Sequence, residues 1–148
     1  MVEEQVIAID PGRDKCGVAV VHKTRGVLGR EVIKTSEVVL RIAQLLGEYD
    51  LAKIVLGNST SSRTLKRQIE GIQTTDRQIE IALVNEYRST DEARTRYWCD
   101  NPPRGIRRLM PLSMQVPPVP VDDYAAVILA ERYFKETSIC VIDKQFYK

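Results

Sequence analysis

Apolar and polar positions in the first part of the chain follow the pattern of successive strands. An apolar run over residues 5–10 (QVIAID) stops at Pro11-Gly12, and a second run over residues 16–21 (CGVAVV) follows a charged turn. A third stretch, residues 27–33, mixes apolar and polar positions as a half-exposed edge strand does. The pattern therefore predicts three successive antiparallel strands.

The period of the pattern then becomes helical. Apolar residues recur at helical spacing up to Tyr49, and Thr35 or Ser36 is expected to cap this helix. A fourth strand is predicted over residues 53–56 (KIVL). It is followed by a hydroxyl-rich turn and an amphipathic helix marked by Leu65, Ile69 and Ile72.

The second half of the chain predicts one more strand, two helices and a long loop. Residues 79–84 (IEIALV) read as a fifth strand, and a short helix begins at Ser89 or Thr90. Residues 100–120 hold most of the prolines, so we expect an irregular loop there. An apolar helix over residues 121–135 and a short strand over residues 139–142 complete the prediction.

Composition narrows the class of protein. The 148 residues are 43% apolar and 28% charged, which fits one folded domain covering residues 1–148. Apolar runs are too short to span a membrane and the VEEQ start is unlike a signal peptide, so we expect a cytoplasmic protein without a membrane partner. The three cysteines are scattered, and the one histidine, His22, is expected at a strand end. The sequence therefore supports neither a disulfide framework nor a zinc site.

Acidic residues stand where predicted elements begin or end. Asp10 ends the first strand, Glu86 follows the fifth, and Asp122 or Asp123 opens the last helix. Each alone has an ordinary explanation as a turn, strand-end or cap residue. Brought together, the carboxylates would suit Mg²⁺ or Mn²⁺, and two such ions promote phosphodiester cleavage.

Several segments resemble the YqgF (RuvX) family of the ribonuclease H-like superfamily. IAIDPGRDKCGVAV resembles the family's first strand and Gly-Val-Ala run, and KIVLG looks like its Ile-Val-Val-Gly strand. NEYRSTDEAR is similar to the stretch that carries the family's catalytic glutamate, which corresponds to Glu86. VDDYAAVILAERYF is similar to its closing helix and puts Asp122 on the third acidic position, with Asp123 in a serine position.

The resemblance implies an α/β ribonuclease H-like fold with a mixed five-stranded sheet flanked by helices. It implies a metal-dependent nuclease in which Asp10 bridges two ions while Glu86 and Asp122, with Asp123 as the alternative, complete the ligands. The substrate would be precursor ribosomal RNA of the small subunit or branched DNA such as a Holliday junction, with the small ribosomal subunit as a further partner. RNA or DNA, and monomer or homodimer, stay open.

The chain departs from the family pattern in three places. Asn85 replaces the aspartate before the glutamate, the arginine after it is displaced to Arg88, and Asn58-Ser59 replaces the usual Leu-Pro. The proline-rich loop also looks longer than the family's. These departures leave the three principal acids in place.

Basic residues near the predicted site offer phosphate contacts. Six arginines between residues 88 and 108 stand against Asp91, Glu92 and Asp100, and a helix start with free amides can also hold phosphate. The residues we expect to contact nucleic acid are Ser59, Thr60, Ser61, Arg63, Lys66, Arg88, Arg94, Arg104, Arg107 and Arg108. The alternative for each arginine is a solvated surface position.

Two other classes of protein fit parts of the sequence. A nucleic-acid-binding or ribosome-associated module could keep this fold while Asn85 and the changed loop weaken catalysis. A phosphotransferase of the actin and sugar-kinase type also begins with a strand, an aspartate and a glycine turn, but it needs two such domains and this chain supplies one.

Overall fold

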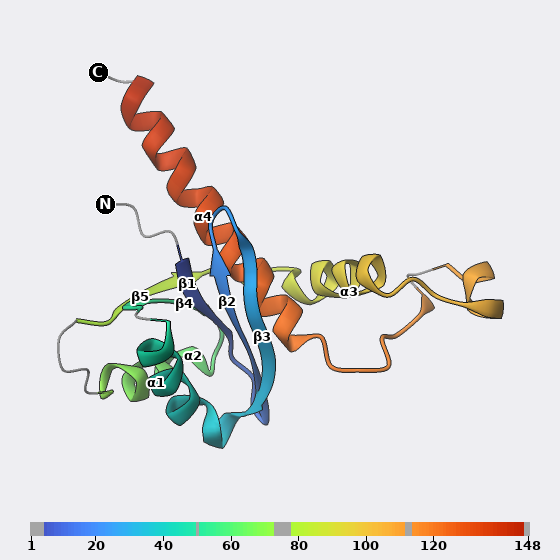
Figure 1. Cartoon of the computed structure of the whole chain (residues 1–148), viewed down its shortest axis with the longest axis horizontal. Helices are drawn as coiled ribbons and strands as arrows, with labels where there is room; N and C mark the ends of the chain where they lie inside the picture. The colour runs from blue at the N-terminus through green and yellow to red at the C-terminus, as the bar shows by residue number, and fades with distance from the viewer. Residues whose placement is uncertain (1–4, 50, 73–77, 112–113, 147–148) are drawn as a thin grey trace.

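The computed structural model describes residues 5–49, 51–72, 78–111 and 114–146, and their strands form one mixed sheet in the order β3-β2-β1-β4-β5 (Figure 1). The strands are β1 (Gln5–Asp10), β2 (Lys15–His22), β3 (Gly26–Lys34), β4 (Lys53–Gly57) and β5 (Glu80–Val84). The first three are antiparallel neighbours, whereas β1, β4 and β5 run parallel. The predicted five-stranded α/β sheet is confirmed, and His22 ends β2 as expected.

One face of the sheet is covered by α1 (Val38–Glu48) and α2 (Ser62–Glu70). Alternate residues of the strands, such as Ile7, Ile9 and Val18, are buried against these helices because side chains along a strand point to opposite faces. The apolar stripe of each helix, read correctly from its spacing, supplies the other half of this core layer.

The expected cap of α1 is wrong. A 3₁₀ turn, η1 (Thr35–Glu37), precedes α1, and neither element has a side-chain cap hydrogen bond. The hydroxyl of Thr35 instead donates to the carbonyl of Gly12 at 3.0 Å, and its amide donates to the carbonyl of Asp14. Thr35 therefore ties the end of β3 to the β1–β2 turn.

The other face is covered by α4 (Asp122–Phe146), with α3 (Ser89–Asp100) alongside it. Ala8, Ala19 and Val55 of the sheet meet Ala126 and Leu129 of α4, and these small and branched side chains allow close packing. The strand predicted over residues 139–142 is wrong, since this segment continues α4. Neither glycine nor proline interrupts residues 122–146, so the sequence offers no stop signal.

Residues 101–111 and 114–121, here called the arm, join α3 to α4 and reach outward from the sheet (Figure 1). The arm holds a short 3₁₀ turn, η2 (Gly105–Leu109), and is otherwise irregular, as the prolines predicted. Ile106 and Leu109 are 84% and 87% exposed. Within the described part of the chain, none of the helices is both long and apolar enough to span a membrane.

Candidate active site

Three parallel strands end together at one edge of the sheet. Asp10 is the last residue of β1 and Gly57 the last of β4, while Glu86 follows β5 by two residues. The register pairs Ile9 with Leu56 and Gly57 with Val84, so the carboxyl ends of these strands lie level. The topology therefore places Asp10 and Glu86 on either side of the central strand β4.

The carboxyl groups of Asp10 and Glu86 share a hydrogen bond. Burial raises the pKa of Asp10 to about 7, and the negative charges of Glu86 and then Asp122 contribute to that rise. Burial also raises the pKa of Glu86, while the hydrogen bond from Asp10 opposes that rise. The pair therefore keeps a shared proton to a higher pH than two isolated carboxyl groups would.

Gly57 makes the space for the Glu86 side chain. A Cβ atom at position 57 would lie 2.7 Å from Cδ of Glu86, closer than real Cβ contacts come, and nearer still to Oε1. That Oε1 atom is buried and has no hydrogen-bond partner among the described residues. A buried carboxylate oxygen without a donor is unfavourable in the protein alone and suits a bound cation or a proton donor.

Gly17 has the same role for the start of α4. It lies opposite Asp10 in the β1–β2 ladder, and a Cβ atom there would lie 2.7 Å from the amide nitrogen of Asp123 and closer still to the Asp122 carbonyl. Only glycine leaves room for backbone at that distance. The first turn of α4 can therefore lie directly over β2, which brings Asp122 near enough to Asp10 to raise its pKa.

The neighbouring carboxylates of α4 have different surroundings. Asp122 is half-buried near Asp10, whereas Asp123 is buried and its Oδ2 accepts a hydrogen bond from Arg30 of β3 at 2.6 Å. The guanidinium of Arg30 also lies 4.1 Å above the ring of Tyr124. Asp123 is thus committed to an ion pair with the sheet, and the geometry favours Asp122 as the third acid of the site.

The acidic group is not a complete ligand shell as it stands. Across the described residues, no set of three or more histidine, cysteine, aspartate or glutamate side chains is arranged so that it could hold a metal ion. Asp10 and Glu86 are in contact, and Asp122 is close enough to interact with Asp10 through its charge. The structure thus brings Asp10 and Glu86 into contact and places Asp122 within range of an electrostatic effect on Asp10.

A family model described as "RuvX: Holliday junction resolvase" matches residues 4–136. The chain belongs to the RuvX family. It is a nuclease, an enzyme that hydrolyses phosphodiester bonds in nucleic acid, as the sequence predicted. No curated protein sequence matches the chain.

Solved structures of the resolvase RuvC share the fold of this RuvX chain. RuvC from T. thermophilus in complex with Holliday junction substrate aligns with a TM-score of 0.55 and 15% identity, over 90% of this chain and 96% of RuvC. A second Thermus thermophilus RuvC structure aligns with a TM-score of 0.55 and 14% identity, over 89% and 94%. This likeness confirms the ribonuclease H-like fold.

The hydroxyl-rich turn of this RuvX chain directly follows Gly57. Ser59, Thr60 and Ser61 form the turn before α2, and the hydroxyl of Ser62 donates to the carbonyl of Ser59 at 2.6 Å. The hydroxyl of Ser59 is buried without a hydrogen-bond partner in the described part of the chain. Arg63 is exposed and Lys66 half-buried on α2, so this turn offers donors beside the acidic edge.

The predicted arginines lie on α3 and on the arm. Arg88 precedes α3 in a left-handed conformation with φ of 57°, and it forms an exposed ion pair of 3.6 Å with Asp91. Arg94 is exposed on α3. Arg104, Arg107 and Arg108 are exposed on the arm, which leads directly into the start of α4. The structure therefore spreads these arginines over two neighbouring elements rather than gathering them in one cleft.

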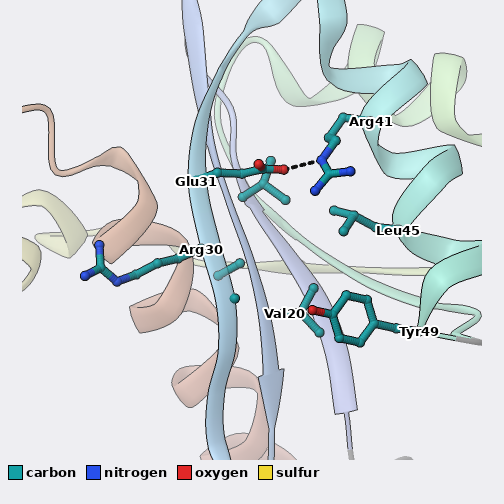
Figure 2. Close-up of a pocket in the computed structure, with 9 residues that line it drawn as sticks. Val20, Arg30, Glu31, Arg41, Leu45 and Tyr49 are labelled. Carbon is teal, nitrogen blue, oxygen red and sulfur yellow. Dashed lines mark hydrogen bonds and ion pairs between the residues drawn. The ribbon is translucent and has the colours of Figure 1, made fainter.

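A separate cavity of about 190 Å³ lies between α1 and the strands β2 and β3, on the face of the sheet that α1 covers (Figure 2). Val20, Leu45 and Tyr49 line it, and an ion pair between Glu31 and Arg41 crosses its rim. Figure 2 shows Arg30 pointing to the opposite face of the strand, toward α4. Asp10, Glu86 and Asp122 are not among the described residues that line this cavity, so we assign the cavity no part in the reaction.

Sequence reasoning missed three residues that shape the RuvX site. The close approaches at Gly17 and Gly57 depend on tertiary contacts, although the Gly-Val-Ala run and the KIVLG strand that contain these glycines were a usable signal. The third is Arg132 of α4, which contacts the loop around Glu86. It sits in the middle of a helix with no local sign of a role at the site.

Proposed function

We propose that this nuclease uses Mg²⁺ or Mn²⁺ held by Asp10, Glu86 and Asp122 to cut either precursor ribosomal RNA of the small subunit or branched DNA. The observation that carries the proposal is the contact between the Asp10 and Glu86 carboxyls, where burial and like charge raise the pKa of Asp10 to about 7. Like charges at one site are stabilised by a cation. Oε1 of Glu86, which is buried without a hydrogen-bond partner among the described residues, supports the same proposal.

The residues of the site would divide the work of hydrolysis. Bound divalent ions supply stabilisation of negative charge on the attacking and leaving oxygens. Asp10 and Glu86 would provide oxygen ligands, and the proton that they share would be released to solvent when the cations bind, because a carboxylate binds a metal ion in its deprotonated form. Asp122, held beside them by the contact of α4 with Gly17, completes the set.

The basic residues would orient the phosphate backbone. Arg104, Arg107 and Arg108 stand in a segment, residues 101–121, that contains no aspartate or glutamate. Exposed arginines without nearby carboxylates attract a polyanion and can donate paired hydrogen bonds to phosphate. Contacts from Arg88 and Arg94 on α3, and from the turn and start of α2, belong to the same proposal. The cytoplasmic location and the choice between monomer and homodimer stay predictions.

The deciding experiment compares the wild type with Asp10→Asn on two labelled substrates, precursor small-subunit ribosomal RNA and a four-way DNA junction, with Mg²⁺ or Mn²⁺. The matched control is Asp14→Asn, which makes the same charge change at an exposed position in the adjacent turn. We expect metal-dependent cleavage that falls at least about 100-fold in Asp10→Asn and is unchanged in Asp14→Asn. The substrate that is cut names the function.

Two outcomes would contradict the proposal. Cleavage that survives Asp10→Asn would remove Asp10 from the reaction. Binding of both substrates without metal-dependent cleavage by the wild type would support a non-catalytic binding module with this fold.

A further inference from the structure

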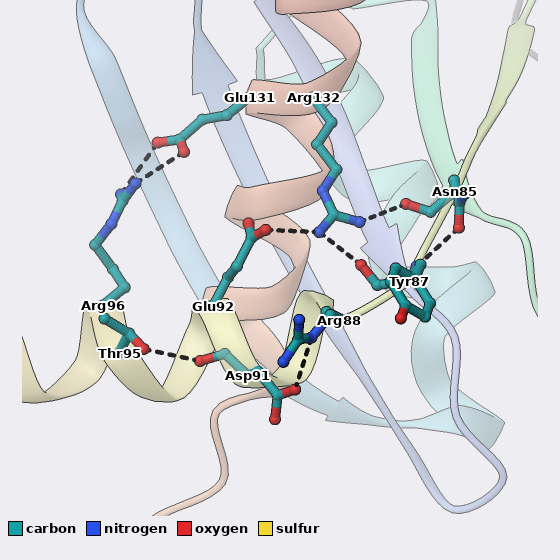
Figure 3. A network of polar contacts seen from close by, with 9 residues as sticks. All are labelled: Asn85, Tyr87, Arg88, Asp91, Glu92, Thr95, Arg96, Glu131 and Arg132. Carbon is teal, nitrogen blue, oxygen red and sulfur yellow. Dashed lines mark hydrogen bonds and ion pairs between the residues drawn. The ribbon is translucent and has the colours of Figure 1, made fainter. Parts of the chain in front are cut away.

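Arg132 of α4 holds the loop that carries Glu86 from both sides of that residue. Its Nη1 donates to the carbonyl of Asn85 and its Nη2 to the carbonyl of Tyr87, each at 2.7 Å (Figure 3). These are the two residues that flank Glu86. The planar guanidinium can donate in both directions at once, which a single ammonium group does less well.

The same guanidinium is itself held in place. Nη2 also donates to Oε1 of Glu92 on α3 at 3.0 Å, and the side chain is only 22% exposed. Within the loop, the Tyr87 amide donates to Oδ1 of Asn85 at 2.8 Å and the Ser89 amide to the Glu86 carbonyl at 2.9 Å. Arg132 thus joins α4, α3 and the Glu86 loop through three hydrogen bonds from one guanidinium.

We propose that Arg132 is a positioning residue for the nuclease reaction, fixing the backbone on both sides of Glu86 so that its carboxylate meets Asp10 against Gly57. The inference rests on the proposed function for the role of Glu86. It adds that α4 sets the position of two acids, since Asp122 opens the helix and Arg132 lies ten residues further along it, at about 15 Å. One rigid helix then links the Asp122 and Glu86 positions.

The test compares Arg132→Lys and Arg132→Met with the control Glu131→Gln. Glu131 is the neighbouring residue of α4, and its carboxylate forms two hydrogen bonds to Arg96 of α3 away from the Glu86 loop (Figure 3). The control therefore breaks a comparable contact between the same two helices. Each variant is assayed for kcat and KM on the substrate that the wild type cleaves, and for binding to an uncleaved four-way junction without metal.

We expect kcat to fall about 10- to 100-fold in both Arg132 variants while KM and junction binding change less than about twofold. Glu131→Gln should keep the wild-type kcat. A structural role alone would lower the folded fraction and leave kcat per folded molecule unchanged. Wild-type kcat in folded Arg132→Lys and Arg132→Met would overturn the proposal.

A second readout does not require cleavage. Amide hydrogen exchange measured by NMR should become faster at Ser89 in Arg132→Lys than in the wild type or Glu131→Gln, because the Ser89 amide is bonded to the carbonyl of Glu86. If the wild type cleaves neither substrate, this measurement still tests whether Arg132 holds the loop. Unchanged exchange at Ser89 would show that it does not.

Discussion

The carboxylate of Glu86 occupies the space where residue 57 would carry its Cβ atom. Gly57 ends β4, the strand between the two that lead to Asp10 and Glu86, and the approach leaves no room for even a methyl group. The contact between the carboxyl groups of Asp10 and Glu86 therefore requires a residue without a side chain at position 57.

Gly57→Ala should displace the Glu86 carboxylate and reduce cleavage by at least about 10-fold, because a shift of about 1 Å at a reacting group has effects of this size. The control is Gly47→Ala at an exposed position of α1, where an added Cβ meets nothing within 4 Å. That variant should retain activity and gain about 0.5 to 1 kcal/mol of unfolding free energy, since alanine is the better helix residue. Wild-type activity in folded Gly57→Ala would show that Glu86 can move at no cost to catalysis.

Gly17→Ala should destabilise the protein more than Gly57→Ala does. The obstacle at position 17 is backbone of α4, which cannot rotate away as a side chain can. We expect a loss of about 3 kcal/mol, the upper range for overpacking a close contact, measured by urea unfolding. An unchanged unfolding midpoint would mean that α4 can pack on the sheet without its close contact at Gly17.

Asp10→Asn should stabilise the metal-free protein increasingly as pH rises. The folded state binds the Asp10 proton more tightly than the unfolded chain, because the pKa rises from 3.8 to about 7. The wild type therefore loses stability as pH rises from about 4 through 7, and the uncharged asparagine does not. The gain from the substitution should be about 2 kcal/mol larger at pH 8 than at pH 5.

Chemical unfolding at the two pH values measures this difference directly. Asp14→Asn, at an exposed position of the same turn, provides the control and should give the same small change at both. An equal effect of Asp10→Asn at pH 5 and pH 8 would mean that the Asp10 carboxyl is not forced to keep its proton.

Arg107→Ala and Arg108→Ala should each weaken nucleic-acid binding and lower the slope of log affinity against log salt concentration by about 1, the value for one lost phosphate contact. Arg25→Ala is the control, because Arg25 is an exposed arginine in the β2–β3 turn, at the opposite end of β2 from Gly17. Fluorescence titration over a range of salt concentrations measures the slope. Identical slopes for all four proteins would remove the arm from the binding surface.

The sequence was informative where one local rule decides the outcome. Strand period located the five strands of the sheet, and helical period located α1 and α2, since these elements have one face in a core layer. The start signal at Ser89 or Thr90 located α3, and an apolar run located α4. It failed where local signals compete with tertiary contacts. Thr35 looks like a helix cap but donates to the β1–β2 turn, and the apolar residues 139–142 look like a strand but continue a helix with no stop signal.

The site was predictable in identity but not in geometry. Asp10 and Glu86 could be named because strand ends and the family resemblance pointed to them, whereas their shared proton depends on burial that only the fold creates. Nothing in the helical pattern could separate Asp122 from Asp123. Their difference comes from Arg30, 93 residues away from Asp123 along the chain.

That ion pair between Arg30 and Asp123 also bears on how the protein can change over time. Asp123 and Arg30 neutralise each other between α4 and β3, so replacing both by uncharged residues leaves no lone buried charge. Asp122, one residue earlier, would bind the metal ions in the proposed reaction, so a second substitution elsewhere could not make up for its loss. In a diverging lineage, positions 30 and 123 should therefore vary together while position 122 stays constant.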